Sequence, residues 1–166
     1  MIIYHGSDII VSEPKILQNQ RLLDFGVGFY TTTNQEQAAR WAKKVCMRRK
    51  SSVGYISVYE LDMDAAKTDL IILRFPVPDA QWLDFICACR SGRQTVTDYD
   101  MVIGPVADDN VYITVKLFET GVLDKEEAVK RLKVEKLFNQ VLFHTEKALS
   151  YCTFQNSIVL EGEENG

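Results

Sequence analysis

The sequence predicts an α+β fold, because strand-like and helix-like segments alternate along the chain without a regular βαβ repeat. Short apolar and β-branched runs predict about six strands, and apolar residues at helical spacing predict several helices between them. With 166 residues, 46% of them hydrophobic, the chain is long enough to bury the core of one domain. We place this domain at residues 1–160 and expect residues 161–166 to form a disordered tail.

The N-terminal region is predicted to begin with two short strands. The first spans residues 2–5 and ends at His5-Gly6, and the second spans residues 27–32 and is rich in glycine and aromatic residues. Each strand places a glycine beside a His or a Tyr, and glycine lets a ligand approach the backbone closely. The ends of these strands are therefore candidate binding positions.

The other predicted elements follow from periodicity and from residues that start or end helices. Asp79, Asp124 and Thr145 are predicted N-caps, and Gly121 is a predicted C-cap. In chain order, the predictions are a mixed connection at 8–23, a helix from Thr33 or Asn34 to about Arg49, strands at 53–61 and 69–75, a helix at 80–90, a strand at 98–105, a helix at 106–120, a helix from Asp124, a strand at 140–144, a helix at 145–151 and a strand at 158–160.

The composition argues against several classes of protein. The formal net charge of −4 gives no electrostatic footprint for a nucleic-acid-binding domain. No apolar run approaches the ~20 residues that a membrane-spanning helix needs, and we expect no signal peptide. The cysteines lack metal-type spacing, so we expect no metal site and buried thiols at Cys87 and Cys89. We expect the protein to lie in a reducing cytoplasm, where such thiols stay free. An injected effector is the alternative, since such export often leaves no apolar leader.

Two strings near the N-terminus resemble the signatures of a known superfamily. Tyr4-His5-Gly6-Ser7 and Gly28-Phe29-Tyr30-Thr31-Thr32 are similar to the first two signatures of the His-Tyr-Glu group of ADP-ribosyltransferases, the diphtheria-toxin-like and PARP-like proteins. Trp41 follows Tyr30 by eleven residues, where this group has a second aromatic residue. Over nearly the whole chain, the pattern is also similar to an uncharacterised bacterial family placed in that superfamily.

The third signature of the group is a late strand that begins with a Glu. Phe138-Asn139-Gln140-Val141-Leu142-Phe143 matches this frame with Gln140 in place of the Glu, and Gln155 is an alternative in a poorer strand context. In this group the carboxylate holds a ribose hydroxyl and stabilises the cation that forms as nicotinamide leaves. An amide can bind the hydroxyl but carries no charge, so the replacement costs on the order of 3 kcal/mol, or 10²–10³ in rate.

The resemblance implies a fold of two packed antiparallel-rich sheets with flanking helices, and NAD as a co-substrate in the cleft between them. It implies that His5 binds the adenosine-side ribose and that the Gly6 backbone grips the nicotinamide carboxamide, next to Ser7. Tyr30 and Trp41 are implied to sandwich the cationic nicotinamide ring, a contact that contributes roughly 1–2 kcal/mol when desolvated.

The implied activity is mono-ADP-ribosyl transfer or NAD hydrolysis, with Gln140, His5 and Tyr30 as candidate catalytic residues. The implied partners are NAD, an unknown protein or nucleic-acid target and, for a toxin or effector, a neutralising protein. The alternative is a non-catalytic NAD-binding or interaction module that has lost transfer together with the Glu.

Some side chains keep two interpretations. Trp41 is either a wall of the nicotinamide site or an ordinary core residue, because its helix also carries small apolar residues at helical spacing. Asp108 and Asp109 either cap a helix or supply a binding-loop acid, and capping is favoured. His144 follows the Gln140 strand and is a candidate cleft residue.

Overall fold

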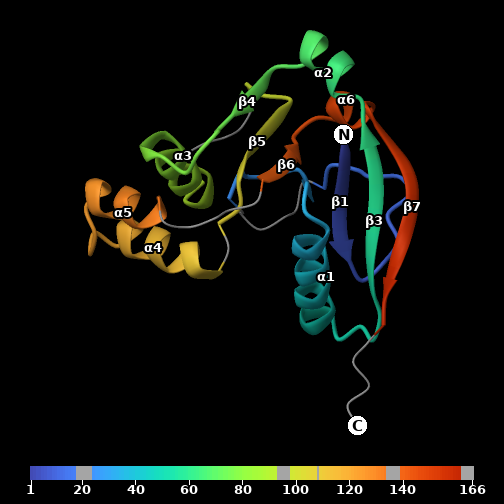
Figure 1. Ribbon diagram of the computed structural model, residues 1–166, viewed down its shortest axis with the longest axis horizontal. Coiled ribbons are helices and arrows are strands. Elements are labelled where there is room, and N and C mark those ends of the chain that lie inside the picture. The colour runs from blue at the N-terminus through green and yellow to red at the C-terminus, as the bar shows by residue number, and fades with distance from the viewer. Residues whose placement is uncertain (18–23, 93–97, 108, 134–138, 162–166) are drawn as a thin grey trace.

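The computed structural model describes residues 1–17, 24–92, 98–107, 109–133 and 139–161, and these residues form an α+β fold around one mixed sheet (Figure 1). The expected fold class is confirmed. The described strands are β1 (Ile2–Ser7), β2 (Phe29–Thr32), β3 (Gly54–Leu61), β4 (Ile72–Arg74), β5 (Met101–Pro105), β6 (Asn139–Phe143) and β7 (Cys152–Leu160). The described helices are α1 (Gln35–Arg49), α2 (Met63–Asp69), α3 (Ala80–Arg90), α4 (Asp109–Glu119), α5 (Lys125–Leu132) and α6 (Glu146–Leu149).

The sheet has the strand order β4-β5-β6-β2-β1-β3-β7, in which β1 and β2 form the weakest junction. These two strands pair only at Tyr4 and Thr32, whereas β1 pairs with β3 continuously from Ile2 to Ser7. We expected two sheets, but hydrogen bonding through this junction joins all the described strands into one. Figure 1 shows the two groups, β4-β5-β6 and β1-β3-β7, at different inclinations on either side of the junction.

The two faces of the sheet carry different residues because strand side chains alternate. One face, here called the Phe29 face, includes Ile3, Phe29 and Phe143, and helices α2 and α6 contribute Ala66, Ala148 and Leu149 to its apolar cluster. The other face, here called the Tyr30 face, includes Tyr4, Tyr30 and Leu142.

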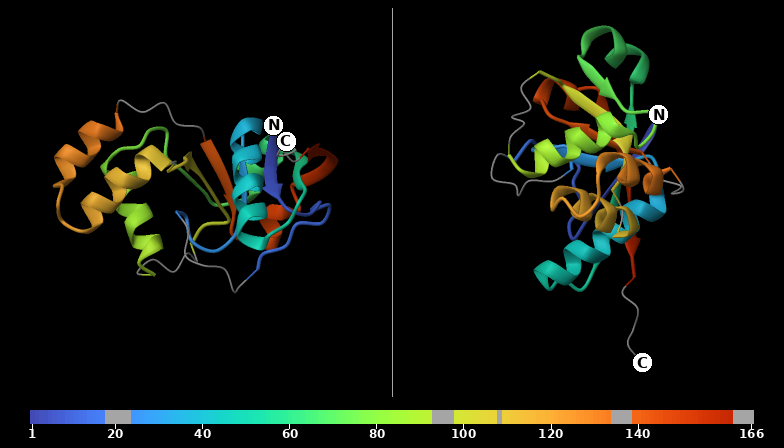
Figure 2. Two further views of the ribbon diagram at one scale, coloured as in Figure 1. Left: turned by 90° about the horizontal axis from the view of Figure 1, so that it is seen from below. Right: turned by 90° about the vertical axis from the view of Figure 1, so that its left-hand side faces the viewer.

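Two separate groups of helices cover the Tyr30 face. Helix α1 packs through Ala38 on Ile56 and Val58 of β3. Helices α3, α4 and α5 instead pack around Val102 of β5 and Leu142 of β6. Figure 2 shows α1 apart from the α3–α5 group, along a different part of the sheet. In the strand order, β2 lies between β6, which carries Leu142 of the α3–α5 cluster, and β1, and its Tyr30 packs against that same cluster.

Several helix starts and ends agree with the predictions. The Asn34 side chain accepts a hydrogen bond from the Gln37 N–H at 2.8 Å, and Asp79 accepts one from Trp82 at 3.0 Å. Asp124 and Thr145 cap α5 and α6 in the same way. Gly121 follows α4 with a φ of 77°, the left-handed conformation that favours glycine. Residues 162–166, most of the expected tail, lie outside the described residues.

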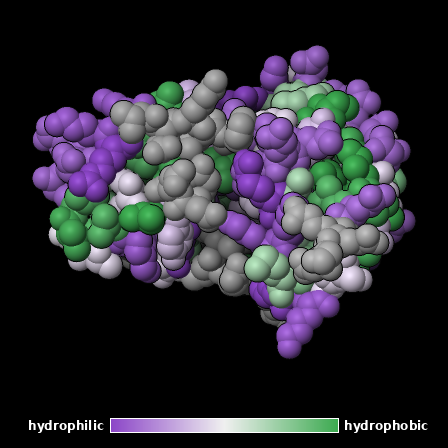
Figure 3. Space-filling model, turned by 60° about the horizontal axis from the view of Figure 1, so that its bottom comes forward, coloured by the Kyte–Doolittle hydropathy of each residue, from purple (hydrophilic) through white to green (hydrophobic). Residues whose placement is uncertain are grey.

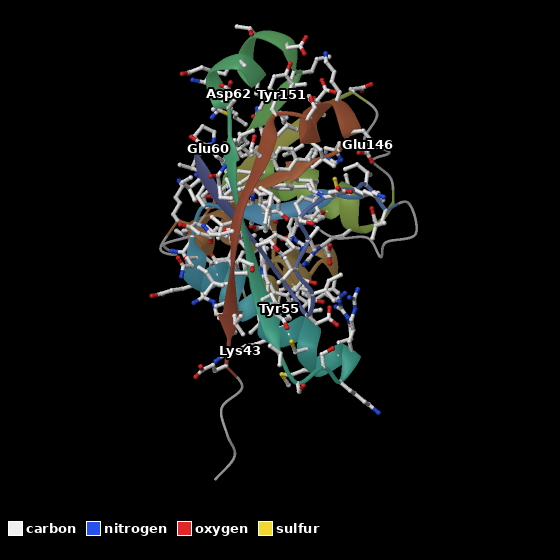
Figure 4. All side chains as sticks on the ribbon, turned by 90° about the vertical axis from the view of Figure 1, so that its right-hand side faces the viewer. Lys43, Tyr55, Glu60, Asp62, Glu146 and Tyr151 are labelled. Carbon is white, nitrogen blue, oxygen red and sulfur yellow. The ribbon has the colours of Figure 1, made fainter. Side chains whose placement is uncertain are left out.

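Helix α2 was not predicted, and it shortens the neighbouring strand. Asp62 caps it through the Ala65 N–H at 3.1 Å, and the Tyr151 hydroxyl donates to Asp69 at its end. Figure 4 shows Asp62 and Tyr151 together at this end of the molecule, with Lys43 and Tyr55 at the opposite end. Because α2 takes up Asp69, strand β4 begins at Ile72 rather than at residue 69.

Further elements also differ from their predicted bounds, and β5, for example, begins at Met101 rather than at residue 98. Strand β7 begins at Cys152 instead of residue 158, and it is an edge strand whose exposed polar side chains hide the strand pattern. Helix α4 begins at Asp109 instead of residue 106, because Val106 is buried directly after β5. Within the described residues, no helix is long and apolar enough to span a membrane.

Candidate functional site

The three motif strands lie side by side in the sheet. Strand β1 carries His5, β2 carries Tyr30 and β6 carries Gln140, and β2 lies between the other two. Thr32 of β2 pairs with Tyr4 on one side and with Gln140 on the other. The fold thus brings together three segments that are far apart in the sequence.

His5 bridges β1 and β2 just past their last paired position. Its Nδ1 lies 2.7 Å from the carbonyl oxygen of Tyr30, and its ring stacks on Phe29 with centroids 4.4 Å apart. Burial lowers the pKa of the imidazole, and the bond to the carbonyl offsets only part of this effect. Since a carbonyl only accepts, the neutral ring donates from Nδ1, and Nε2 is left as an acceptor for a ligand hydroxyl.

The side chains of His5 and Tyr30 do not share a face of the sheet. His5 stacks on Phe29, whereas Tyr30 and Gln140 alternate with Thr31 and Val141 and so lie on the Tyr30 face. His5 therefore contacts the backbone carbonyl of Tyr30, and the side chains of His5 and Tyr30 lie on opposite faces of the sheet. A ligand that contacts both must reach across the β1–β2 junction.

Gly6 is required by the packing of α1. A Cβ at this position would overlap the carbonyl oxygen of Ala38 and lie 2.8 Å from the backbone nitrogen of Ala42. We expected the glycine to open the strand to a ligand, but the helix fills the side on which a side chain would stand. The backbone N–H and C=O of Gly6 are the groups left as candidate ligand contacts.

Ser7 has a structural role at the end of β1. Its Oγ donates to Asp8 Oδ1 at 3.3 Å, and the same oxygen accepts a bond from Arg49 Nη1 at 2.8 Å. Ser51 Oγ donates to the other carboxylate oxygen at 2.8 Å. These contacts tie β1 to the C-terminal end of α1, and within the described residues the Ser7 side chain makes no hydrogen bond to another candidate site residue.

The Tyr30 hydroxyl holds the turn that leads into β2. It accepts a hydrogen bond from the Phe25 N–H at 3.2 Å and donates to the carbonyl of Gly26, whose φ is 82°. Burial raises the pKa of the phenol well above its ordinary value, and the charge of Asp24 raises it further. The side chain is thus a neutral, half-buried ring on the Tyr30 face, fixed at its far end.

Trp41 is half-buried on α1 and belongs to none of the apolar clusters formed by the described residues. Its neighbours Ala38 and Ala42 provide the buried contacts of this helix. The structure therefore favours a surface or site role for Trp41 over the core alternative. Within the described part of the chain no ring contact joins Trp41 and Tyr30, and a clamp around a third ring requires none.

Gln140 is a buried polar residue near the start of β6. Its relative exposure is 2%, and its Nε2 has no hydrogen-bond partner. It pairs with Thr32 on one side and Gly104 on the other, which places it in the middle of the sheet. Gln155 instead lies exposed on the edge strand β7, where its Nε2 donates to the Thr153 carbonyl at 3.3 Å. The structure thus favours Gln140 as the match to the third signature.

An acid–base pair beside Gln140 was not predicted. Asp24 Oδ1 accepts hydrogen bonds from Arg90 Nε at 3.0 Å and Nη2 at 2.9 Å, and Oδ2 accepts one from the Ala107 N–H at 3.3 Å. Burial raises the pKa of the Asp24 carboxyl, while Arg90, the Ala107 N–H and Gln140 act to lower it. The Arg90 guanidinium lies 4.7 Å from the ring centroid of Tyr112. We call Asp24, Arg90 and Gln140 the Asp24 cluster.

The other candidate residues lie elsewhere or outside the description. His144 Nδ1 lies 2.7 Å from the Val27 carbonyl oxygen, its Nε2 is buried without a partner, and burial lowers the pKa of its ring. Asp109 begins α4, and Asp108 lies outside the described residues. The contact of His144 with the Val27 carbonyl holds the turn before β2, and the contact of His5 with the Tyr30 carbonyl holds β2 itself.

Hydrophilic side chains lie on the surface between the two groups of helices (Figure 3). Figure 3 shows hydrophilic residues gathered at the centre of this view, between the half that contains α4 and α5 and the half that contains α1. Among the described residues, no group of three His, Cys, Asp or Glu side chains is arranged to hold a metal ion. Cys87 and Cys89 are free and buried on α3, as expected for structural thiols.

The two histidines predict a loss of stability in mild acid. The pKa values of both imidazoles are lowered in the folded state. Below about pH 6.5, these two side chains are therefore protonated in the unfolded chain but stay neutral in the folded chain. The free energy of unfolding should therefore fall as the pH drops from 7 toward the lowered pKa values. A His5→Gln/His144→Gln variant should lose most of this decline in urea denaturation, and an unchanged decline would contradict the assignment.

The site and fold define a class: an α+β domain in which His, Tyr and Gln motifs lie on three adjacent strands of one sheet. The chain belongs to the family described as "Protein of unknown function (DUF3990)", whose model matches residues 1–154. The matched region contains His5, Asp24, Tyr30, Arg90 and Gln140. Comparison with curated proteins and with solved structures found no match.

Proposed function

We propose that this protein has an ADP-ribosyltransferase-like fold, binds NAD and slowly cleaves the bond between nicotinamide and ribose. The observation that carries the proposal is the adjacency of β1, β2 and β6, with His5 Nδ1 2.7 Å from the Tyr30 carbonyl oxygen. A chance resemblance in three separate strings gives no reason for them to meet in one part of the sheet. The single paired position between β1 and β2 also supports a division into two sheet-like halves with a cleft beside the junction.

In the proposed complex, the nicotinamide ring lies between Tyr30 and Trp41. Both aromatic side chains are half-buried, so each has a part that a ligand can reach. The backbone of Gly6 supplies a donor and an acceptor for the carboxamide, and the Nε2 of neutral His5 accepts a hydrogen bond from a ribose hydroxyl. The assignment of these groups to parts of NAD comes from the resemblance, and the neutral state of His5 is compatible with it.

The proposed reaction breaks the bond between C1′ of the ribose and the nicotinamide nitrogen. The electron pair of this bond leaves with neutral nicotinamide, and a water or a nucleophile of the target forms the new bond to C1′ and releases its proton. The positive charge that develops on the ribose needs a nearby negative group. Because Gln140 is neutral, we expect slow turnover.

A non-catalytic NAD-binding or interaction module is the second candidate. The observation that favours it is that the motif residues have structural duties: His5 and Tyr30 fix backbone carbonyls, and Gly6 accommodates α1. In that case the site binds NAD without cleaving it. Both candidate functions are compatible with a protein or nucleic-acid target and with a neutralising partner protein. Both are also compatible with a cytoplasmic protein or an injected effector.

NAD binding is tested by thermal unfolding. If Tyr30 contacts the nicotinamide ring, NAD at 100 times its Kd should stabilise the wild type by about 2.7 kcal/mol, and Tyr30→Ala should lose most of this shift. Tyr30→Phe should keep most of it, since the ring is retained. Tyr99→Ala is a matched control, because Tyr99 is also half-buried against the cluster that contains Leu142. An equal NAD shift in Tyr30→Ala and Tyr99→Ala removes Tyr30 from the site.

A further inference from the structure

Two buried N–H groups without partners lie in the Asp24 cluster. They are the Nη1 of Arg90 and the Nε2 of Gln140. Gln140 is close enough to Asp24 to lower the pKa of its carboxyl, yet its Nε2 makes no hydrogen bond of ordinary length. Native proteins rarely leave buried donors unpaired, because each such group loses its hydration without compensation. Two of them around one carboxylate indicate a site that something else completes.

The carboxylate of Asp24 retains capacity to accept another hydrogen bond. Arg90 donates twice to Oδ1, and Oδ2 receives a single long bond of 3.3 Å from Ala107. Each carboxylate oxygen has two acceptor positions, so Oδ2 can take a second donor. The stack of Arg90 on Tyr112 holds the guanidinium in place without using its N–H groups. The cluster thus presents one acceptor and two donors.

The chemistry of the cluster selects a neutral ligand. Asp24 and Arg90 cancel each other's charge, so the pair as a whole attracts neither an anion nor a cation. A group that both donates and accepts satisfies all three positions, and two adjacent hydroxyls do so at once. We propose that Asp24, Arg90 and Gln140 bind the vicinal hydroxyls of a ribose, with Asp24 as the acceptor and the Nη1 of Arg90 and the Nε2 of Gln140 as the donors.

The identity of this ribose rests on the proposed function, in which it is the sugar joined to nicotinamide. The cluster lies close to Tyr30: the hydroxyl of Tyr30 binds the backbone of Phe25 and Gly26, the two residues after Asp24. Gln140 shares the Tyr30 face. Asp24 then brings to this ribose the carboxylate acceptor that Gln140 lacks, from a different segment of the chain and with its charge balanced by Arg90.

The test compares binding of ADP-ribose and ADP, which differ by the terminal ribose, in isothermal titration. The wild type should bind ADP-ribose at least about 10-fold more tightly than ADP, the effect of one or two hydrogen bonds to a charged group. Asp24→Asn should remove this preference and leave the affinity for ADP unchanged. Asp8→Asn is the matched control, because it removes a partly buried Asp–Arg pair outside the cluster, and it should keep the preference.

Gln140→Leu separates binding from folding. Because the Nε2 of Gln140 lacks a partner, an apolar side chain of similar size should leave thermal stability equal or higher while it weakens the preference for ADP-ribose. A preference that survives in Asp24→Asn or Gln140→Leu, or its absence in the wild type, overturns the ribose site. None of these results depends on nicotinamide or on cleavage, so the ribose site can stand if NAD is not cleaved, and can fail while NAD still binds through Tyr30.

Discussion

Gly6→Ala should destabilise the protein by about 3 kcal/mol or more and lower its Tm by roughly 10 °C. The new methyl group would overlap the carbonyl oxygen of Ala38, and the next nearest atom is the backbone nitrogen of Ala42 at 2.8 Å. Both are backbone atoms of α1, so no side chain can turn away to make room. Helix α1 must shift as a whole, and this shift weakens the contacts of Ala38 with Ile56 and Val58.

Gly54→Ala provides the matched control for this prediction. Gly54 is also a strand glycine that faces α1, but a Cβ there would lie 3.4 Å from the Cys46 sulfur and 3.5 Å from the Ala42 Cβ, which are ordinary contacts. We expect its Tm to stay within a few degrees of the wild type, since the added methyl group meets its neighbours at ordinary van der Waals distances. Equal Tm values for the two variants would contradict the close packing of α1 on Gly6.

Gln140 variants should change turnover more than binding. If the Gln140 amide holds a ribose hydroxyl, Gln140→Ala should release nicotinamide from NAD more slowly than the wild type. Gln140→Glu should be at least as fast as the wild type, with a gain of up to about 10², because the added charge acts mainly on the developing cation. Single-turnover release of nicotinamide, with Kd for NAD measured separately, distinguishes the two effects.

The position of Asp24 limits the gain expected from Gln140→Glu. A second carboxylate next to Asp24 raises the pKa of one or both groups, so the gain should grow as the pH is raised. Equal release by wild type, Gln140→Ala and Gln140→Glu would detach Gln140 from the reaction and favour the non-catalytic module. Loss of activity in Gln140→Glu alone would mean that the site is built around a neutral amide.

The parts of the fold that could be predicted are those encoded by neighbouring residues. Asn34, Asp79 and Thr145 each bond an N–H three residues further on, so a single string of sequence contains the whole interaction. Helix α2 was missed because seven residues are too few to show a helical period. The start of β7 was missed because β7 is an edge strand, and its many exposed polar side chains do not alternate clearly with buried apolar ones.

The site was predictable only in part, for the same reason. The strings around His5, Tyr30 and Gln140 are local, and the fold places them on adjacent strands. The Asp24–Arg90 pair joins residues 66 positions apart, and each member has an ordinary local explanation, as a polar residue before a glycine turn or as a cation at a helix end. The close approach of α1 to Gly6 is likewise a tertiary contact that one sequence does not reveal.

The most direct measurement is the fate of NAD incubated with the wild-type protein, followed by chromatography of free nicotinamide, ADP-ribose and intact NAD. We predict that nicotinamide appears slowly, in proportion to the concentration of protein, and that Tyr30→Ala stops its release while Tyr99→Ala does not. ADP-ribose should appear in equal amount where water is the acceptor. The account is contradicted if the wild type neither releases nicotinamide nor binds NAD at millimolar concentration while it remains folded.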